Sequence, residues 1–484
     1  MSNERKLQRQ LSPMHVWAIA FGCIIGWGSF VNPGKKFLPN SGVAGTAIAM
    51  ALGAIVMIII AFSYAYMIPK YPRAGGEFTF TKACFGKNMA FVCGWFLIAA
   101  YLTNVPMNST AIGLIVDGID GNADILKFGF HYTLAGFEIY FGEMIFAMAI
   151  LILFAIMNIC GVKKAAIIQT VLSSLLVVSV IVLVISALVS DKAQIINMQP
   201  IWGFDKNAAI AAGATTENIS EFANSGAGGI TSAILATFAI APWAYVGFDT
   251  IPQAAEEFKF SYKKVIGIMV VAILFGCFVY TANNTVAAAA LENWPDRVMA
   301  GEWVLLVAAE EMLGVFGKVL IGTAVSCAVL SGMMGFYLAA SRLMYSMASE
   351  GYLPSVFAKI DSKFGTPKNA IIFCMIISLS GPILGREALG WFVDMSAIGA
   401  SIGFFFTSAA TVCKIKTDKD TNPLFSIMAV LGMLFSIVFM ILQLIPIPGL
   451  SGVHFGKESY YMLLVWVLLG VTFYLFKRKD ICKN

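Results

Sequence analysis

The chain has 484 residues, of which 59% are hydrophobic and 12% are charged, and its mean hydropathy is +0.82. Soluble domains carry about 25% charged residues, so this composition excludes an ordinary soluble protein and indicates a chain that lies mostly in a lipid bilayer. The net charge of +5 comes from basic residues at the ends of apolar runs rather than from a basic stripe with aromatic residues, so no nucleic-acid partner is expected.

Apolar stretches occupy most of the sequence, and a bilayer span takes about 20 apolar residues. We expect an all-α polytopic membrane protein with twelve transmembrane helices and no signal peptide. In chain order the expected spans are Met14–Leu38, Gly42–Pro69, Met89–Val116, Ile139–Cys160, Ala165–Val189, Gly229–Glu257, Val265–Leu291, Val319–Met347, Asn369–Leu384, Leu389–Cys413, Leu424–Ile445 and Tyr460–Phe476.

The orientation follows from the distribution of Lys and Arg. If the N-terminus is cytoplasmic and twelve spans alternate in direction, 23 of the 32 Lys and Arg fall in cytoplasmic segments. Acidic residues favour the other side, at Asp191, Glu217, Glu221, Glu292, Glu310 and Glu311. We therefore predict a multi-pass protein of the plasma membrane with both termini in the cytoplasm.

The first span contains three glycines, Gly22, Gly26 and Gly28. Each disfavours a continuous helix by about 1 kcal/mol relative to alanine. In lipid, a broken helix is tolerated only where the freed backbone groups face protein, water or a ligand. The pattern predicts a discontinuous helix whose free backbone groups bind a ligand. The alternative is that Gly22 and Gly26 form a GxxxG motif for close helix packing.

The sixth span carries a second interruption, because Pro242 removes a helical hydrogen bond and Gly247 loosens the backbone. Asp249 lies within the same span, where an ionisable group is costly and functional by default. The alternative for Asp249 is that its carboxylate only caps the half-helix after the break.

The two interrupted spans lie five spans apart, and such pairs in corresponding places are the best sequence indication of a transporter site. An odd number of spans per repeat also inverts the second half relative to the first. We expect a 5+5 inverted repeat with helices 1 and 6 unwound at mid-membrane. The expected divisions are a cytoplasmic tail at 1–13, the first repeat at 14–189, an extracellular loop at 190–228, the second repeat at 229–413, two further helices at 414–476 and a cytoplasmic tail at 477–484.

Four motifs give the chain its resemblance to a known family. They are Gly22–Phe30, Pro72–Phe80, Ala244–Asp249 with Ala255–Glu257, and the series Ser341–Tyr345, Glu350–Pro354 and Gly365–Ala370. In order and spacing they resemble amino acid permeases of the amino acid–polyamine–organocation (APC) superfamily, which have the LeuT-type fold. The resemblance covers residues 12 to about 415. Trp27 and Ser29 depart from the family pattern, which usually has a small residue and Ile there, so the substrate is left open.

The resemblance implies a substrate site at the two breaks. The substrate carboxylate would meet N–H groups at the positive end of the second half-helix, and its ammonium would meet carbonyl groups of the sixth span. The expected substrate-binding residues are Ile24, Ile25, Gly26, Trp27, Gly28, Ser29, Ala241, Trp243, Ala244, Tyr245 and Gly247. Trp243 and Tyr245 are also candidate gates. Trp95, Tyr101, Asn104 and Ser396 could line the pocket, although a structural role suits each of them better.

Coupling and gating residues are expected near the same spans. Asp249 is a candidate for proton coupling, and Arg342 is expected at an inner gate with Glu256 or Glu257 as its partner. Many proton-coupled relatives carry a lysine in the fifth span, but the matching position here is Leu176. A sodium ion could instead bind near Gly22, Cys23, Ser326 and Ser331. Ion-independent exchange is the further alternative.

The leading functional hypothesis is therefore a secondary active transporter that moves an amino acid by alternating access, without a cofactor or bound metal. A neutral amino acid is favoured, because Asp249 is the one acidic side chain expected clearly at mid-depth. A polyamine or ethanolamine-like amine and an amino-acid exchanger are the alternatives. An enzyme is not expected, because His15, His131 and His454 lie near span ends or in loops and no HExxH or GxSxG motif occurs. A channel or nutrient receptor is not excluded.

Overall fold

The computed structural model describes residues 7–120, 124–134, 137–204, 210, 211, 213–215, 219, 229–386, 388–418, 422–447 and 454–483. These residues are mostly helical, which agrees with the predicted class. One antiparallel hairpin precedes α5 in the described residues, with β1 (His131–Leu134) paired to β2 (Phe137–Tyr140) so that His131 lies opposite Tyr140. The fourth expected span therefore begins two residues late, because Ile139 and Tyr140 belong to this hairpin.

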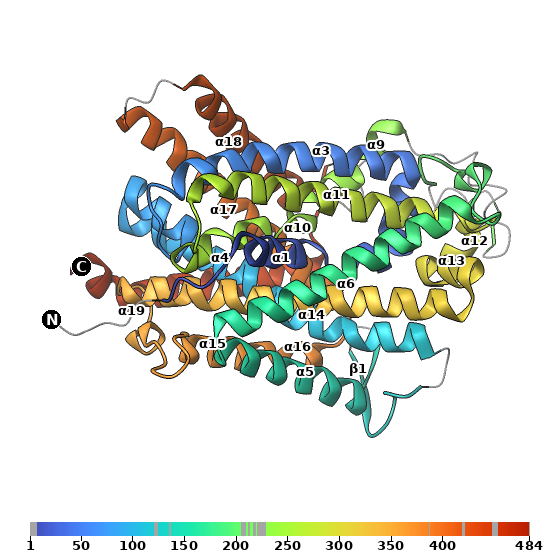
Figure 1. Cartoon of the computed structure of the whole chain (residues 1–484), viewed down its shortest axis with the longest axis horizontal. Helices are drawn as coiled ribbons and strands as arrows, with labels where there is room; N and C mark the ends of the chain where they lie inside the picture. Colours follow the sequence, from blue (N-terminus) through green and yellow to red (C-terminus); the bar gives the residue numbers. More distant parts are fainter. Residues whose placement is uncertain are drawn as a thin grey trace.

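Nine helical segments in the described ranges are long and apolar enough to cross a membrane, and they run side by side along the molecule (Figure 1). They correspond to nine of the expected spans. The helices are α3 (Leu38–Met67), α4 (Gly76–Asp120), α5 (Phe141–Ile159), α6 (Val162–Val189), α11 (Val265–Ala289), α14 (Val315–Ser349), α17 (Ala388–Asp418), α18 (Pro423–Leu444) and α19 (Lys457–Lys483).

The first, sixth and ninth expected spans are interrupted. The first consists of α1 (Pro13–Ile24), α2 (Gly28–Asn32) and a π-helical turn at Pro33–Phe37. The sixth consists of α9 (Ile230–Phe238), α10 (Ala241–Ala244) and two 3₁₀ segments, η3 (Phe248–Thr250) and η4 (Pro252–Glu257). The ninth is divided into α15 (Lys368–Ser378) and α16 (Ser380–Leu384). The predicted breaks in the first and sixth spans are thus confirmed.

Short elements complete the chain between these helices. They are the 3₁₀ turns η2 (Ile195–Met198), η5 (Tyr262–Lys264) and η6 (Ser355–Ala358), and the helices α12 (Trp294–Met299) and α13 (Val304–Leu313). Glycines with positive φ kink two long helices, at Gly42 in α3 and at Gly86 in α4. In the loop expected at 190–228, residues 205–209, 212, 216–218 and 220–228 lie outside the described residues.

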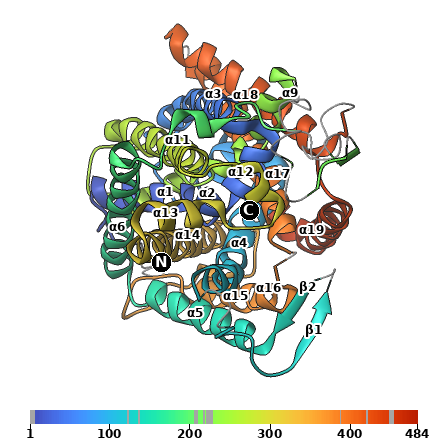
Figure 2. The ribbon, with the colours of Figure 1, turned by 90° about the vertical axis from the view of Figure 1, so that its right-hand side faces the viewer.

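The broken spans occupy the middle of the bundle. In the view along the helices, α1 and α2 are surrounded by α6, α11, α14 and α17 (Figure 2). Helix α1 packs directly on α6, α11 and α14, and α4 packs most extensively on α17 and α14. Phe21 and Phe30, on either side of the first break, are fully buried. The breaks therefore face protein rather than lipid, as the cost of free backbone groups requires.

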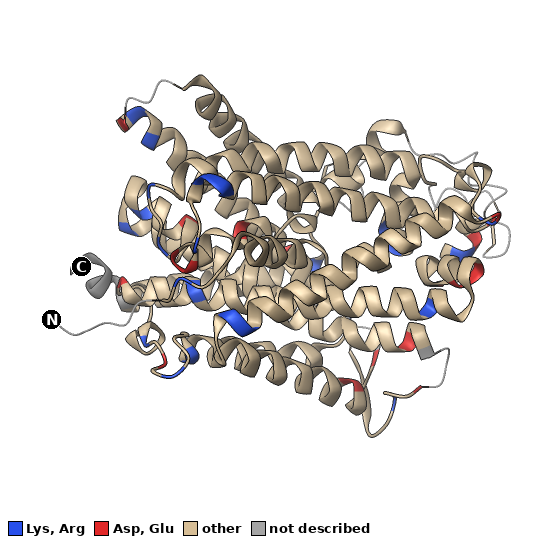
Figure 3. Ribbon diagram, in the orientation of Figure 1, with Lys and Arg blue, Asp and Glu red and all other residues tan. Residues whose placement is uncertain are grey.

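Basic residues gather at one end of the bundle, which is the end where the described chain both begins and finishes (Figures 1 and 3). We call it the basic end. Ion pairs there join Lys70 to Asp418 and Lys82 to Glu350.

Candidate functional site

The first break leaves consecutive backbone N–H groups without partners among the described residues. Helix α1 ends as Ile25 turns to an extended conformation, with φ −96° and ψ 101°. The N–H groups of Ser29 and Phe30 bond back to the carbonyls of Gly26 and Trp27. No hydrogen bond within the described ranges uses the N–H of Gly26 or Trp27, and Gly28 begins a helical segment, where the N–H lacks an intrahelical partner. These groups form a site that suits an anionic oxygen.

The second break lies directly against the first. Gly247 has φ 146°, and an ideal β-carbon there would lie 2.6 Å from the nitrogen of Ile24 and 2.7 Å from the carbonyl oxygen of Ala20. Only glycine permits both this backbone conformation and this approach. The carbonyl of Ala241 accepts the N–H group of Tyr245 and keeps a second lone pair, whereas the carbonyl of Trp243 accepts the N–H groups of both Tyr245 and Val246.

Side chains of α11 hold the backbone on both sides of the first break. Tyr280 donates its hydroxyl hydrogen to the carbonyl of Ile24 over 3.3 Å, and the Asn283 amide donates to the carbonyl of Ser29 over 3.0 Å. These bonds satisfy two of the carbonyls that flank the free N–H groups.

Two indole rings lie over the break. The ring centroids of Trp27 and Trp243 are 6.3 Å apart, and a side chain at Gly28 would overlap the Trp243 ring. Trp243 is therefore placed where a gate would cover the free N–H groups. Tyr245 is placed elsewhere, because its hydroxyl donates to the carbonyl of Met50 in α3 over 2.8 Å.

Helix α4 contributes a residue that the sequence reasoning missed. The Asn108 side-chain oxygen is buried without a hydrogen-bond partner among the described residues, and an ideal β-carbon on Gly26 would lie 3.5 Å from it. The sequence signal that could have identified Asn108 is its position four residues after Asn104, because this spacing places two polar side chains on one face of an apolar helix. Asn104 itself donates to Ser396 over 2.6 Å, which fits the structural role expected for this pair.

Of the residues proposed for sodium, Ser331 lies beside Gly22, whereas Ser326 lies on another face of its helix. The Ser331 hydroxyl donates to Ala328 in its own helix over 3.0 Å and lies 3.4 Å from the carbonyl of Gly22. Ser326 precedes it by five residues, which places the two hydroxyls on different faces of α14. Cys23 and Leu176 are both buried.

Gly22 is expected to serve packing rather than binding. An ideal β-carbon there would overlap the Gln169 amide and lie 2.9 Å from the Ser331 β-carbon. Because overpacking a tight core costs about 1–3 kcal/mol, Gly22→Ala should lower the Tm of the purified protein. Gly26→Ala is the matched control and should leave the Tm unchanged, because its β-carbon has room. Equal Tm values for the two variants would contradict this distinction.

Asp249 is buried at the second break and has both carboxylate oxygens engaged. One oxygen accepts the Gly247 N–H over 2.7 Å, and the other accepts the Tyr101 hydroxyl of α4 over 3.0 Å. The first bond is the capping contact, and the second ties the break to α4.

The expected inner gate contains a fully buried ion pair. Arg342 of α14 lies 3.0 Å from Glu257, and these side chains are 1% and 0% exposed. Glu256 instead accepts the N–H of Ala74 over 3.1 Å. The N–H groups of Gln10 and Leu11 donate to the carbonyl of Glu257, so the segment that precedes α1 is attached to the residue that pairs with Arg342.

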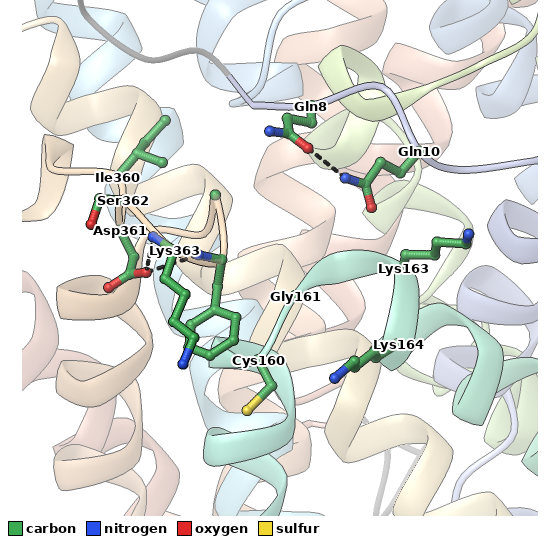
Figure 4. Close-up of a pocket in the computed structure, with 12 residues that line it drawn as sticks. Gln8, Gln10, Cys160, Gly161, Lys163, Lys164, Ile360, Asp361, Ser362 and Lys363 are labelled. Atoms are coloured by element: carbon green, nitrogen blue, oxygen red, sulfur yellow. Dashed lines mark hydrogen bonds between the residues drawn. The ribbon is translucent and has the colours of Figure 1, made fainter.

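Two cavities open at the basic end. One of about 920 Å³ is lined by the 70–74 loop, Thr79, Glu256 and Ser346, among others. Another of about 510 Å³ lies between the start of α6 and the 360–365 loop, with Lys163, Lys164 and Lys363 around it (Figure 4). The backbone N–H groups of Phe364 and Lys363 lower the pKa of Asp361 there, so an anionic group already accompanies these lysines. Neither cavity contains the residues of the breaks.

Comparison with known proteins gives consistent matches. A family model described as amino acid permease matches residues 11–469. The branched-chain amino acid permease BcaP of Bacillus subtilis (strain 168) is 26% identical over 499 residues, covering 99% of this chain and 95% of that protein. The human large neutral amino acids transporter small subunit 2 is 27% identical over 374 residues, covering 77% of this chain and 64% of the human protein. The Bacillus subtilis (strain 168) methylthioribose transporter is 23% identical over 497 residues, covering 100% of this chain and 96% of that protein.

Long apolar helices around two broken central segments define a polytopic membrane protein with open backbone groups in its interior. The chain belongs to the amino acid permease family, because the family model spans nearly its whole length. This confirms the resemblance to the APC superfamily. The family is one of transporters and not of enzymes.

Proposed function

We propose that the protein is a secondary transporter of a neutral amino acid in the plasma membrane, with the basic end in the cytoplasm. The proposed architecture has twelve spans, of which the first ten form two inverted five-span repeats. Alternating access would open the two breaks to one side of the membrane at a time.

The free N–H groups of Gly26, Trp27 and Gly28 are the observation that carries this proposal. They suit a carboxylate, and the carbonyl of Ala241 in the second break, which keeps one lone pair, is the proposed acceptor for an ammonium group. A zwitterion would thus need no charged side chain from the protein. Because both oxygens of Asp249 are already engaged, a cationic side chain on the substrate has no obvious partner there.

The relatives support an apolar substrate side chain, since two of them are named for branched-chain and large neutral amino acids. An amine without a carboxylate, such as a polyamine or ethanolamine, is the alternative. It would leave the N–H groups of the first break unpaired, which disfavours it.

The test is counterflow in proteoliposomes that contain the purified protein. Vesicles loaded with unlabelled leucine should accumulate labelled leucine, whereas a receptor would bind it without accumulation. Competition by the twenty amino acids, ethanolamine and putrescine then defines the substrate. Failure of every amino acid to compete, with competition by an amine alone, would contradict the proposal.

Uptake is expected to be independent of sodium. Ser331 bonds to its own helix and Ser326 faces elsewhere, so the oxygen ligands of a sodium site are incomplete. Replacing external sodium with choline should leave the uptake rate within about twofold, and Ser331→Ala should not change that ratio. A sodium requirement that Ser331→Ala weakens would overturn this expectation.

A further inference from the structure

Two carboxyl groups meet in a dry site beside the second break. Glu77 comes from the first turn of α4, and Asp249 comes from η3, and both are 0% exposed. Among the ion pairs of the described residues, none involves either carboxylate. The Arg342 guanidinium is already paired with Glu257. A like-charged pair without a cation is an unfavourable arrangement in the interior of a membrane protein.

The hydroxyl of Tyr101 connects the two groups. It lies 3.0 Å from the Oδ2 atom of Asp249 and 3.4 Å from the Oε1 atom of Glu77, although it has only one hydrogen to donate. Glu77 also accepts from the Tyr64 hydroxyl over 2.8 Å and from the Gln253 amide over 2.6 Å.

The site contains more acceptors than donors. The side-chain oxygen of Gln253, whose nitrogen contacts both Glu77 and Tyr101, is buried with no partner in the described part of the chain. Among the residues that the structure describes, the other titratable groups around the pair are Tyr64 of α3, Cys93 of α4 and Cys23 of α1, and none of them is basic. The pair therefore lacks one hydrogen, which a proton on either carboxyl group would supply.

We propose that Glu77 and Asp249 together bind one exchangeable proton, which crosses the membrane with the substrate. This inference rests on the proposed transport function and assigns its coupling ion. Two carboxyl groups bridged by one hydroxyl in a dry site are more stable when one of them is protonated, because each negative charge disfavours ionisation of the other.

The position of the pair explains how the proton and the substrate are coupled. Asp249 accepts the N–H of Gly247, and Gly247 packs on the nitrogen of Ile24 at the end of α1. On the other side, Ala74 and Thr79 flank Glu77 in sequence and line the 920 Å³ cavity at the basic end. Movement of η3 away from α4 would break the contact between Asp249 and Tyr101. The proton then leaves a carboxyl oxygen for water in that cavity, and only O–H bonds change.

The test uses the full-length protein in sodium-free liposomes with a pH-sensitive dye trapped inside. Adding leucine outside wild-type vesicles should acidify the interior, and acid outside should stimulate uptake. Glu77→Gln and Asp249→Asn should each lose the acidification and the pH stimulation while keeping leucine counterflow. Asp361→Asn, in an exposed loop at the same end, is the matched control and should behave as wild type.

The outcomes separate this inference from the transport function. Counterflow without acidification in the wild type, or acidification that survives both substitutions, would overturn the proton site and leave transport intact. Sodium-driven uptake that Glu77→Gln abolishes would assign a metal cation to the pair instead. Absence of counterflow in the wild type would reject the proposed function itself. Should a variant not fold, infrared difference spectra of the wild type between acid and alkaline buffer must still show a titrating carboxyl band.

Discussion

Gly26→Leu is expected to abolish transport while leaving the protein folded in the membrane. The β-carbon position at Gly26 is open apart from the Asn108 oxygen at 3.5 Å, so a leucine side chain can enter the space in front of the free N–H groups. Hydrogen bonds to a charged group contribute about 1.5–3 kcal/mol each. Losing two of them should weaken substrate binding by at least about 100-fold, since each 1.4 kcal/mol is about tenfold.

The measurement combines leucine binding by scintillation proximity, counterflow in proteoliposomes and the Tm of the purified variant. Gly26→Ala is the control, because a methyl group fits without reaching across the break. Normal uptake by Gly26→Leu would support the GxxxG packing interpretation of this glycine and would contradict a substrate site at the break.

Arg342→Glu is expected to have the second large effect. Arg342 and Glu257 are buried together, and breaking such a pair costs about 3–5 kcal/mol because one charge remains unpaired. Reversal adds repulsion between two carboxylates. We expect a clear fall in Tm and transport slowed more than substrate binding, because the pair joins α14 to the end of η4 rather than lining the break.

The exchanged pair Arg342→Glu with Glu257→Arg tests this explanation. It restores opposite charges at the same place, so it should recover part of the Tm and of the transport rate. An equal loss of binding and transport in the single variant would indicate misfolding and would remove the argument for a gate. Glu256→Gln is the comparison variant, because its partner is the backbone of Ala74 and not Arg342.

Local backbone chemistry explains why the breaks could be predicted. The glycines at 22, 26 and 28 and the pair Pro242 and Gly247 weaken a helix wherever they occur. The apolar runs likewise predict spans, because their length is set by the thickness of the bilayer. The ninth span is the exception, because its division into α15 and α16 was not predicted although Gly381 and Pro382 follow it directly.

The sequence by itself determined that this chain is a membrane protein with two broken spans, one of them bearing Asp249. Only the tertiary structure decided which distant side chains meet. It paired Arg342 with Glu257 instead of Glu256, turned Tyr245 toward α3, and brought Glu77 to Gln253 across 176 positions of sequence. Backbone interruptions depend on neighbouring residues, whereas these contacts depend on the rotation and packing of whole helices.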